Sequence, residues 1–324
     1  MGWKGTIRSV QATSRKIERD SNRRQKELER ERKNIEKLNA LEQANYEVNV
    51  YNNYVEVIQS IHKEWGNRID WEGILNADEP AKPENLNEYE NNFKAGLLTK
   101  LFGNEGKKRL EAIKKDTTEY EAAYEKWESD HFSWNKHKIL AEKLLTDTGD
   151  PSSKIEVIET VNPFTDMSEI GLSIDLSVAN NGVVEVELLT NGQGIVPPEV
   201  KSLLQSGKLS VKKMPKGVFN EIFQDHICSS VLRVGNELLA ILPDDIVIIH
   251  ANDKILNKTT GHMEEQCIIS VAVSRDTISA LNMDLIDPSD SLGNFVHNMS
   301  FTKIKGFSAT EKLLPSSFSV KKAS

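Results

Sequence analysis

Apolar side chains recur at alternating spacings of three and four from residue 105 to residue 146, the repeat of a helix that packs along one seam. No Gly or Pro follows Gly106 in this stretch, so we predict one unbroken helix from Glu105 to Thr146. At 1.5 Å per residue such a helix is about 60 Å long, more than a compact domain requires. It therefore needs a long partner. The seam positions are Leu110, Ile113, Thr117, Tyr120, Tyr124, Trp127, His131, Trp134, Lys138, Ala141 and Leu145.

A second long helix is predicted from Thr6 to Trp65, because this range contains neither Gly nor Pro. Its first half is polar on every face, whereas its second half has a heptad seam of its own. Two seams rich in Tyr and Trp are natural partners, so we predict an antiparallel helical hairpin. The second seam consists of Leu41, Ala44, Val48, Tyr51, Val55, Ile58, His62 and Trp65.

Residues 66–104 form the tip of this predicted hairpin. Residues 69–75 favour a short helix, and residues 77–85 contain two prolines and favour a loop. Residues 89–102 favour a third short helix that folds back on the stalk. Its apolar face could instead contact a protein or a membrane surface. That face consists of Phe93, Leu97, Leu98, Leu101 and Phe102.

The hydrophobic period changes from helical to alternating after the breaker-rich stretch Asp147–Ser153, which marks a domain boundary near residue 150. Residues 172–178 and 183–189 flank a good hairpin turn. We predict strands at residues 155–161, 172–178, 183–189, 208–214, 246–251, 267–274 and 301–307, and helices at residues 198–205, 216–242 and 287–299.

These elements predict an α+β protein. A helical stalk occupies residues 1–149, and residues 150–314 form a mixed domain whose sheet packs on the central helix at residues 216–242. The polar residues 315–324 are expected to be a loose tail.

Composition describes a soluble chain rich in exposed helix, with 38% hydrophobic and 28% charged residues. Two cysteines provide no disulfide framework and fit a reducing compartment. Met1–Val10 has no apolar stretch of the kind found in signal peptides, and the apolar runs are too short to span a bilayer. We therefore expect a cytoplasmic protein without a membrane span.

Charge is unevenly distributed along the chain, whose net charge is −8. Residues 1–37 contain 12 Lys and Arg against 6 Asp and Glu, which gives +6, whereas residues 151–324 contain 15 against 21, which gives −6. The basic arm could bind phosphate groups of nucleic acid or anionic lipid. Its many acids, and the lack of aromatic residues after Trp3, favour either a salt-bridged solvated helix or a protein-docking arm. Its candidate contact residues are Arg15, Arg19, Arg23 and Arg24.

Three acids lie on one face of the predicted hairpin at residues 172–189: Asp175, Glu185 and Glu187. The order helix, three strands, helix, strand resembles the core shared by many metal-dependent nucleases, in which such carboxylates hold a divalent cation. The lysine usual after the second acid is missing, because Leu189 stands two residues beyond Glu187. Alternation alone explains acids on a solvated face, so we expect no metal chemistry and no cofactor here.

A second candidate group follows the apolar strand at residues 246–251. His250 ends that strand, Asp253 follows three residues later, and His262 lies in the next predicted loop. Strand ends commonly host metal or acid–base groups, so these three are a further possible site. A hairpin that merely ends at this point is the simpler interpretation.

Two functional readings follow. The favoured one is a non-enzymatic assembly or adaptor protein, whose stalk binds a partner or a second copy and whose α+β domain recognises another molecule. The alternative is a nucleic-acid-processing enzyme with a divergent nuclease-like domain and a phosphate-binding arm. Salt-sensitive DNA binding with metal-dependent cleavage would favour the second reading, and a stable oligomer without either property would favour the first.

Overall fold

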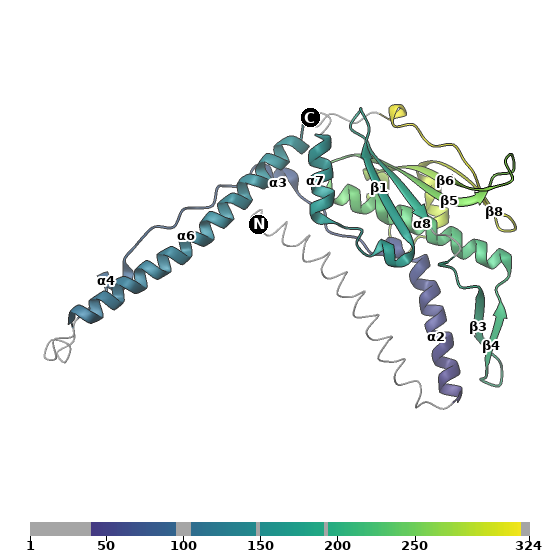
Figure 1. Ribbon diagram of the computed structural model, residues 1–324, viewed down its shortest axis with the longest axis horizontal. Helices are drawn as coiled ribbons and strands as arrows, with labels where there is room; N and C mark the ends of the chain where they lie inside the picture. The colour runs from purple at the N-terminus through teal and green to yellow at the C-terminus, as the bar shows by residue number, and fades with distance from the viewer. Residues whose placement is uncertain (1–39, 95–104, 147–149, 191–193, 319–324) are drawn as a thin grey trace. The chain divides into compact units, whose positions relative to one another are not determined.

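The computed structural model describes residues 40–94, 105–146, 150–190 and 194–318 (Figure 1). These residues group into two compact units. We call residues 70–142 the arm unit, and residues 40–69 together with residues 143–318 the sheet unit. The chain is thus a mixture of helix and sheet, as predicted. The grouping differs from a division at residue 150, because residues 40–69 pack with the C-terminal part of the chain.

The arm unit is built on α6 (Glu105–Leu144), a 40-residue helix that confirms the predicted one. Its aromatic seam contacts an extended segment of chain. The indole Nε1 of Trp127 donates to the carbonyl oxygen of Pro80 at 2.9 Å, and that of Trp134 donates to Ala77 at 3.1 Å. Because the prolines and polar residues of this segment do not form a helix, their carbonyl oxygens are free to accept these bonds. The predicted pairing of the two heptad seams is not confirmed.

Two short helices precede α6. In α3 (Trp71–Leu75), the Asp70 carboxylate caps the first turn by accepting from the backbone N–H of Gly73. The second, α4 (Glu88–Asn91), is held by Asp116, which accepts from the backbone N–H groups of Tyr89 and Glu90. The helix predicted from residue 89 is therefore interrupted at residue 92, and its continuation at residues 95–104 lies outside the described residues.

The sheet unit contains a six-stranded sheet with the order β1-β2-β5-β6-β7-β8. Strands β2 and β5 are parallel, and each of the other neighbouring pairs is antiparallel. The β-hairpin predicted at residues 172–189 is confirmed as β1 and β2. Gly182 takes the positive φ of 84° that its turn requires. The strands are β1 (Leu172–Val178), β2 (Val184–Thr190), β5 (Ile246–Leu256), β6 (Met263–Ser274), β7 (Val296–Thr302) and β8 (Gly306–Ser308).

The predicted central helix is confirmed as α8 (Lys216–Ile241), which packs on one face of this sheet (Figure 1). By register, the buried side chains of β2, such as Val186, share this face with Val247 and Val273. Gly235 permits a close approach, since a Cβ there would lie 2.9 Å from a methyl carbon of Val273.

The opposite face of the sheet is partly covered by the C-terminal segment. Leu313 and Phe318 pack against a buried cluster formed by Val183, Ile248 and Ala272. Residues 315–318 were expected to begin a loose tail, but the amide of Asn181 donates to the carbonyl oxygens of Pro315 and Phe318. An apolar side chain and two hydrogen bonds thus attach residues 315–318 to the sheet unit, and residues 319–324 lie outside the described residues.

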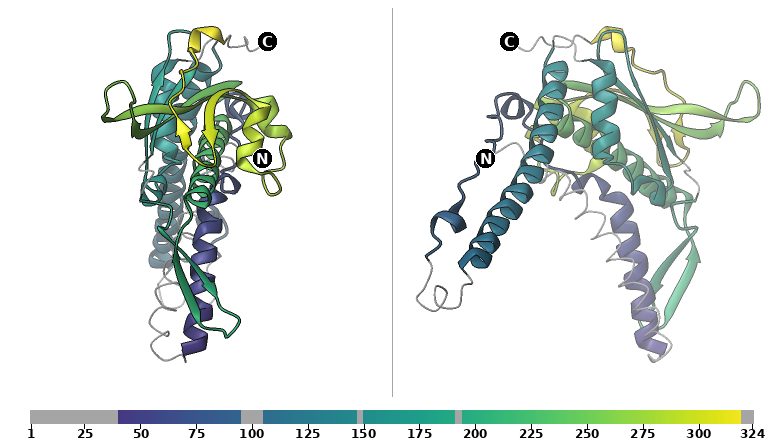
Figure 2. Two further views of the ribbon diagram at one scale, coloured as in Figure 1. Left: turned by 90° about the vertical axis from the view of Figure 1, so that its right-hand side faces the viewer. Right: turned by 60° about the vertical axis from the view of Figure 1, so that its left-hand side comes forward.

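Helix α2 (Ala40–Gln59) belongs to the sheet unit. It packs on α8 and beside a separate two-stranded sheet of β3 (Glu199–Leu203) and β4 (Leu209–Lys213), as Figures 1 and 2 show. The helix predicted from Thr6 to Trp65 was too long at its C-terminal end, because α2 ends at Gln59. A 3₁₀ turn, η1 (Ile61–Lys63), follows α2 and buries His62, whose backbone N–H and ring both bond to the Ser229 hydroxyl.

Four further sequence predictions in the sheet unit were wrong. In place of one strand at residues 301–307, β7 ends at Thr302 and β8 begins at Gly306 after a turn. Residues 155–161 belong to a helix, α7 (Pro151–Val161), since Asp150 caps it and Pro151 opens its first turn. Residues 198–205 contain strand β3, which pairs with β4. Helix α10 (Pro288–Ser291) and a 3₁₀ turn end at residue 294, because the next residues pair with β6 as strand β7. A further short helix, α9 (Arg275–Ala280), follows β6.

Candidate functional site

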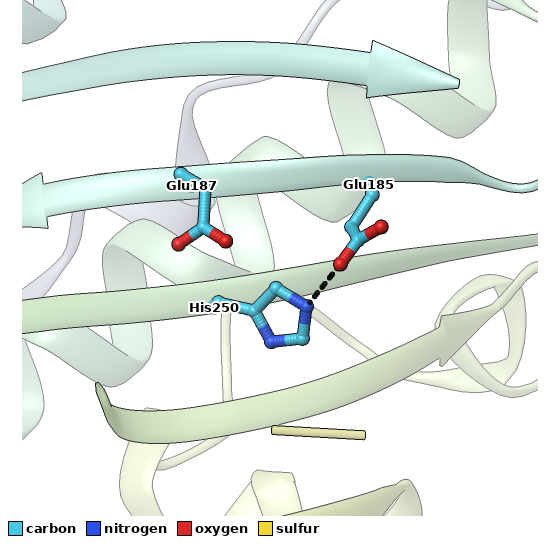
Figure 3. Close-up of side chains that lie close together, drawn as sticks. All are labelled: Glu185, Glu187 and His250. Atoms are coloured by element: carbon cyan, nitrogen blue, oxygen red, sulfur yellow. Dashed lines mark hydrogen bonds and ion pairs between the residues drawn. The ribbon is translucent and has the colours of Figure 1, made fainter. Parts of the chain in front are cut away.

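A polar cluster lies on the sheet face that α8 does not cover. Glu185 and Glu187 alternate with the buried valines of β2 and are half-buried. His250 stands beside Glu187 in the parallel register of β2 and β5, and its ring is completely buried. Figure 3 shows the three side chains projecting from the two strands toward one another. Two adjacent strands therefore gather two carboxylates and one imidazole.

Hydrogen bonds orient the imidazole at both of its nitrogens. Nε2 of His250 lies 3.0 Å from a Glu185 carboxylate oxygen, and Nδ1 lies 2.8 Å from the Ser270 hydroxyl on β6. The backbone N–H of Leu313 donates to that same hydroxyl at 2.8 Å. The Ser270 proton is thus free to point at Nδ1, which leaves the proton on Nε2 to donate to Glu185.

The second carboxylate has two partners of its own. The amide of Asn252 donates to one oxygen of Glu187 at 2.5 Å, and Nζ of Lys312 lies 2.5 Å from the other. Asn252 is buried, whereas Lys312 is 43% exposed at its side chain. The acid is therefore held firmly from the β5 side and more loosely from the C-terminal segment.

Burial of the cluster disfavours the charged form of its imidazole. Burial lowers the pKa of His250 below its usual value, and the hydrogen bond to Glu185 and the charges of Glu185 and Glu187 oppose that shift. A neutral imidazole and two carboxylates are all metal-ligand types. One potential ligand atom from each of the three lies within 4.8 Å of the others, and within the described part of the chain this is the one such group.

The structure brings some of the predicted site residues together and keeps others apart. Glu185 and Glu187 converge, whereas Asp175, which stands opposite Glu187 on β1, is exposed and does not belong to the group. His250 was predicted to lie with Asp253 and His262, but it lies with the two glutamates. His262 is exposed in the loop between β5 and β6.

Asp253 instead lines a cavity of about 570 Å³ at the ends of β2 and β5. Lys254 and Glu265 line the same cavity, together with Thr190, whose buried hydroxyl has no hydrogen-bond partner.

The nuclease-like order of elements is not realised in the main sheet. The first of the three predicted strands, at residues 155–161, is instead helix α7. The strand predicted at residues 208–214 is β4, and it pairs with β3 in a separate sheet. Three residues of the observed cluster were missed: Asn252, Ser270 and Lys312. The sequence offered a signal for the first two, which interrupt otherwise apolar strands, but none for Lys312, which reaches Glu187 across 125 residues of chain.

The predicted interaction residues fall largely outside this description. Arg15, Arg19, Arg23 and Arg24 lie outside the described residues, as do Leu97, Leu101 and Phe102, and Phe93 is half-buried. Another exposed apolar surface is present on α6. Phe132 is 72% exposed and Ile139 is 44% exposed, and the two stand seven residues apart on one helix face.

No known protein family, curated protein or solved structure matches the chain. Among the helices within the described ranges, none is long and apolar enough to cross a membrane.

Proposed function

We propose that this chain is a non-enzymatic assembly protein that associates with a second copy of itself through α6. The observation that carries the proposal is the exposure of Phe132 on a 40-residue helix. One face of α6 is occupied by the segment from Ala77 to Asn91, through the bonds from Trp127 and Trp134 and to Asp116. Phe132 and Ile139 project from a different face.

Burial of apolar surface favours an association that covers the helix face with Phe132 and Ile139. Transferring one large apolar side chain out of water is worth about 1.5–3 kcal/mol, and two copies of a helix bring together at least two such pairs. A helix about 60 Å long also offers room for an extended contact that a compact unit could not supply. Self-association along α6 would therefore use both its length and its exposed apolar residues.

The test is the mass of the protein in solution, measured by light scattering. We expect the parent chain to form a species of at least twice 36.5 kDa. Replacing Phe132 and Ile139 together by serine should return it to the mass of one chain.

The matched control is Lys126→Ser, because Lys126 is exposed on the same helix and lies about 120° around its axis from Phe132, outside the proposed contact. It should leave the mass of the oligomer unchanged. A parent chain with the mass of one copy at every concentration tested, or a double variant that stays oligomeric, would contradict the proposal.

A further inference from the structure

We propose that Glu185, Glu187 and His250 form a binding site for a transition-metal dication, with Zn²⁺ the best match. This site lies in the sheet unit and shares no residue with the exposed face of α6, so it is independent of the proposed assembly. It also revises the expectation from sequence, which considered the acids without the imidazole.

The donor set is the first argument. A tetrahedral metal with ligand bonds of about 2.0–2.2 Å places its ligand atoms about 3.4 Å apart. The three side chains bring theirs within 4.8 Å of one another, and rotations of the two glutamates about their own side-chain bonds supply the remaining adjustment. Each glutamate is half-buried, so its carboxylate can reach solvent and an incoming ion.

The surroundings of the imidazole are the second argument. A histidine that binds a metal through Nε2 needs a hydrogen-bond acceptor at Nδ1, which fixes the ring and its tautomer. The Ser270 hydroxyl is already there at 2.8 Å. Its oxygen has two lone pairs, one used by the Leu313 N–H and one available for Nδ1–H. Metal binding then requires that the proton on Nε2 leave, that Nδ1 become protonated, and that the Ser270 hydroxyl turn its own proton away from Nδ1 so that it can accept.

The two partners of Glu187 determine how the site would respond to an ion. Asn252 is a neutral donor that orients the carboxylate and leaves its charge intact. Lys312 is a cation at the same carboxylate and therefore competes with a metal for its charge. Because the Lys312 side chain is 43% exposed, its ammonium group can move into solvent when a metal takes its place.

The same donor set indicates which metal is preferred. One nitrogen and two carboxylate oxygens suit Zn²⁺, and Mn²⁺ less well, whereas Mg²⁺ prefers an all-oxygen octahedral shell. Three protein ligands would leave one tetrahedral position of Zn²⁺ open to water.

The test is titration of the full chain with Zn²⁺ by isothermal calorimetry. We expect one equivalent to bind, with no comparable heat from Mg²⁺. Glu185→Gln and Glu187→Gln each remove a ligand charge while keeping the shape of the side chain, and should weaken binding by more than about 100-fold. Ser270→Ala should weaken it by about tenfold, through loss of the ring's orienting partner.

Two further variants separate this site from adventitious binding. Asp175→Asn removes an exposed carboxylate from the adjacent strand and should change the affinity by less than about twofold. Lys312→Met should tighten binding by about fivefold, because it removes the competing cation of an exposed ion pair. Melting curves establish that each variant is folded.

The proposal fails if the folded parent binds no Zn²⁺. It fails equally if Glu185→Gln and Glu187→Gln bind as tightly as the parent, which would place the ion elsewhere.

Discussion

At the scale of single residues, buried ionisable side chains connect the stability of the sheet unit to pH. Glu237 on α8 is 3% exposed, and burial raises its pKa to about 7, against the opposing charge of Arg233. Its carboxylate lies against Gly66, where a Cβ would sit 3.2 Å from one oxygen. A buried Lys154–Asp244 pair lies elsewhere in the unit, with the ammonium also donating to the carbonyl oxygen of Gly182. Such groups stabilise the fold only in suitable protonation states.

Replacing Glu237 by glutamine should make the protein less sensitive to alkaline pH. The folded-state pKa of Glu237 lies above its unfolded value, so the folded chain holds the proton more tightly. Its stabilising contribution is complete below pH 4.5 and is lost as pH rises through about 7. The full loss is on the order of 3 kcal/mol, since each pKa unit corresponds to about 1.4 kcal/mol. The measurement is denaturant unfolding of parent and variant at mildly acidic and mildly alkaline pH. Equal losses in both proteins would show that another group titrates.

At the scale of elements, the contact of α8 with β6 depends on a glycine, which has no side chain to separate the helix from the strand. Gly235 brings the helix so close that an added Cβ would lie 2.9 and 3.0 Å from the two methyl carbons of Val273. Neither partner can yield easily, because both Gly235 and Val273 are buried in the unit. Gly217, near the start of the same helix, meets only the flexible side chain of Lys303.

Gly235→Ala should therefore destabilise the sheet unit by about 1–2 kcal/mol, because the overpacking cost exceeds the gain in helix propensity. Gly217→Ala is the matched control in the same helix and should change stability by less than about 0.5 kcal/mol. Thermal melts of both variants make the comparison. A Gly235→Ala variant that melts with or above the parent would mean that the helix and strand are not in such close contact.

At the scale of the whole molecule, the division into two units implies that each can lose stability by itself. The arm unit relies on a row of rings along α6, in which Trp127 lies 5.3 Å from Tyr124 and 5.2 Å from His131, between centroids. The sheet unit relies on its central sheet and α8. These are different sets of contacts, and changes to them should add independently.

Trp127→Ala should loosen the arm unit and leave the sheet unit intact. Because the Trp127 ring is only half-buried, we expect a cost of about 2 kcal/mol, less than for a fully buried ring. Hydrogen exchange should become faster in α6 and stay unchanged in α8. Faster exchange in both helices would show that the units unfold together.

Local signals in the sequence determined much of the secondary structure. An uninterrupted seam defined α6, alternation around Asn181–Gly182 defined the β1–β2 hairpin, and a broad apolar face defined α8. Such signals depend on neighbours within a few residues, so they can be read without knowing the fold. The sequence also contains Asp150 and Pro151, which cap and begin α7, although the alternation at residues 155–161 predicts a strand.

Which distant side chains meet depends on how the whole chain packs. Both heptad seams are compatible with a helical partner. In the structure, however, α2 packs on α8, whereas the α6 seam contacts an extended segment. An apolar stripe indicates that a helix face is buried, but it does not specify which surface covers that face. The polar cluster follows the same rule. Glu185 and His250 meet through the parallel pairing of β2 and β5, and Lys312 arrives with the C-terminal segment. Period-2 alternation places a side chain on one face of a strand, but strand order and register determine its neighbours, and these are set by packing of the whole unit.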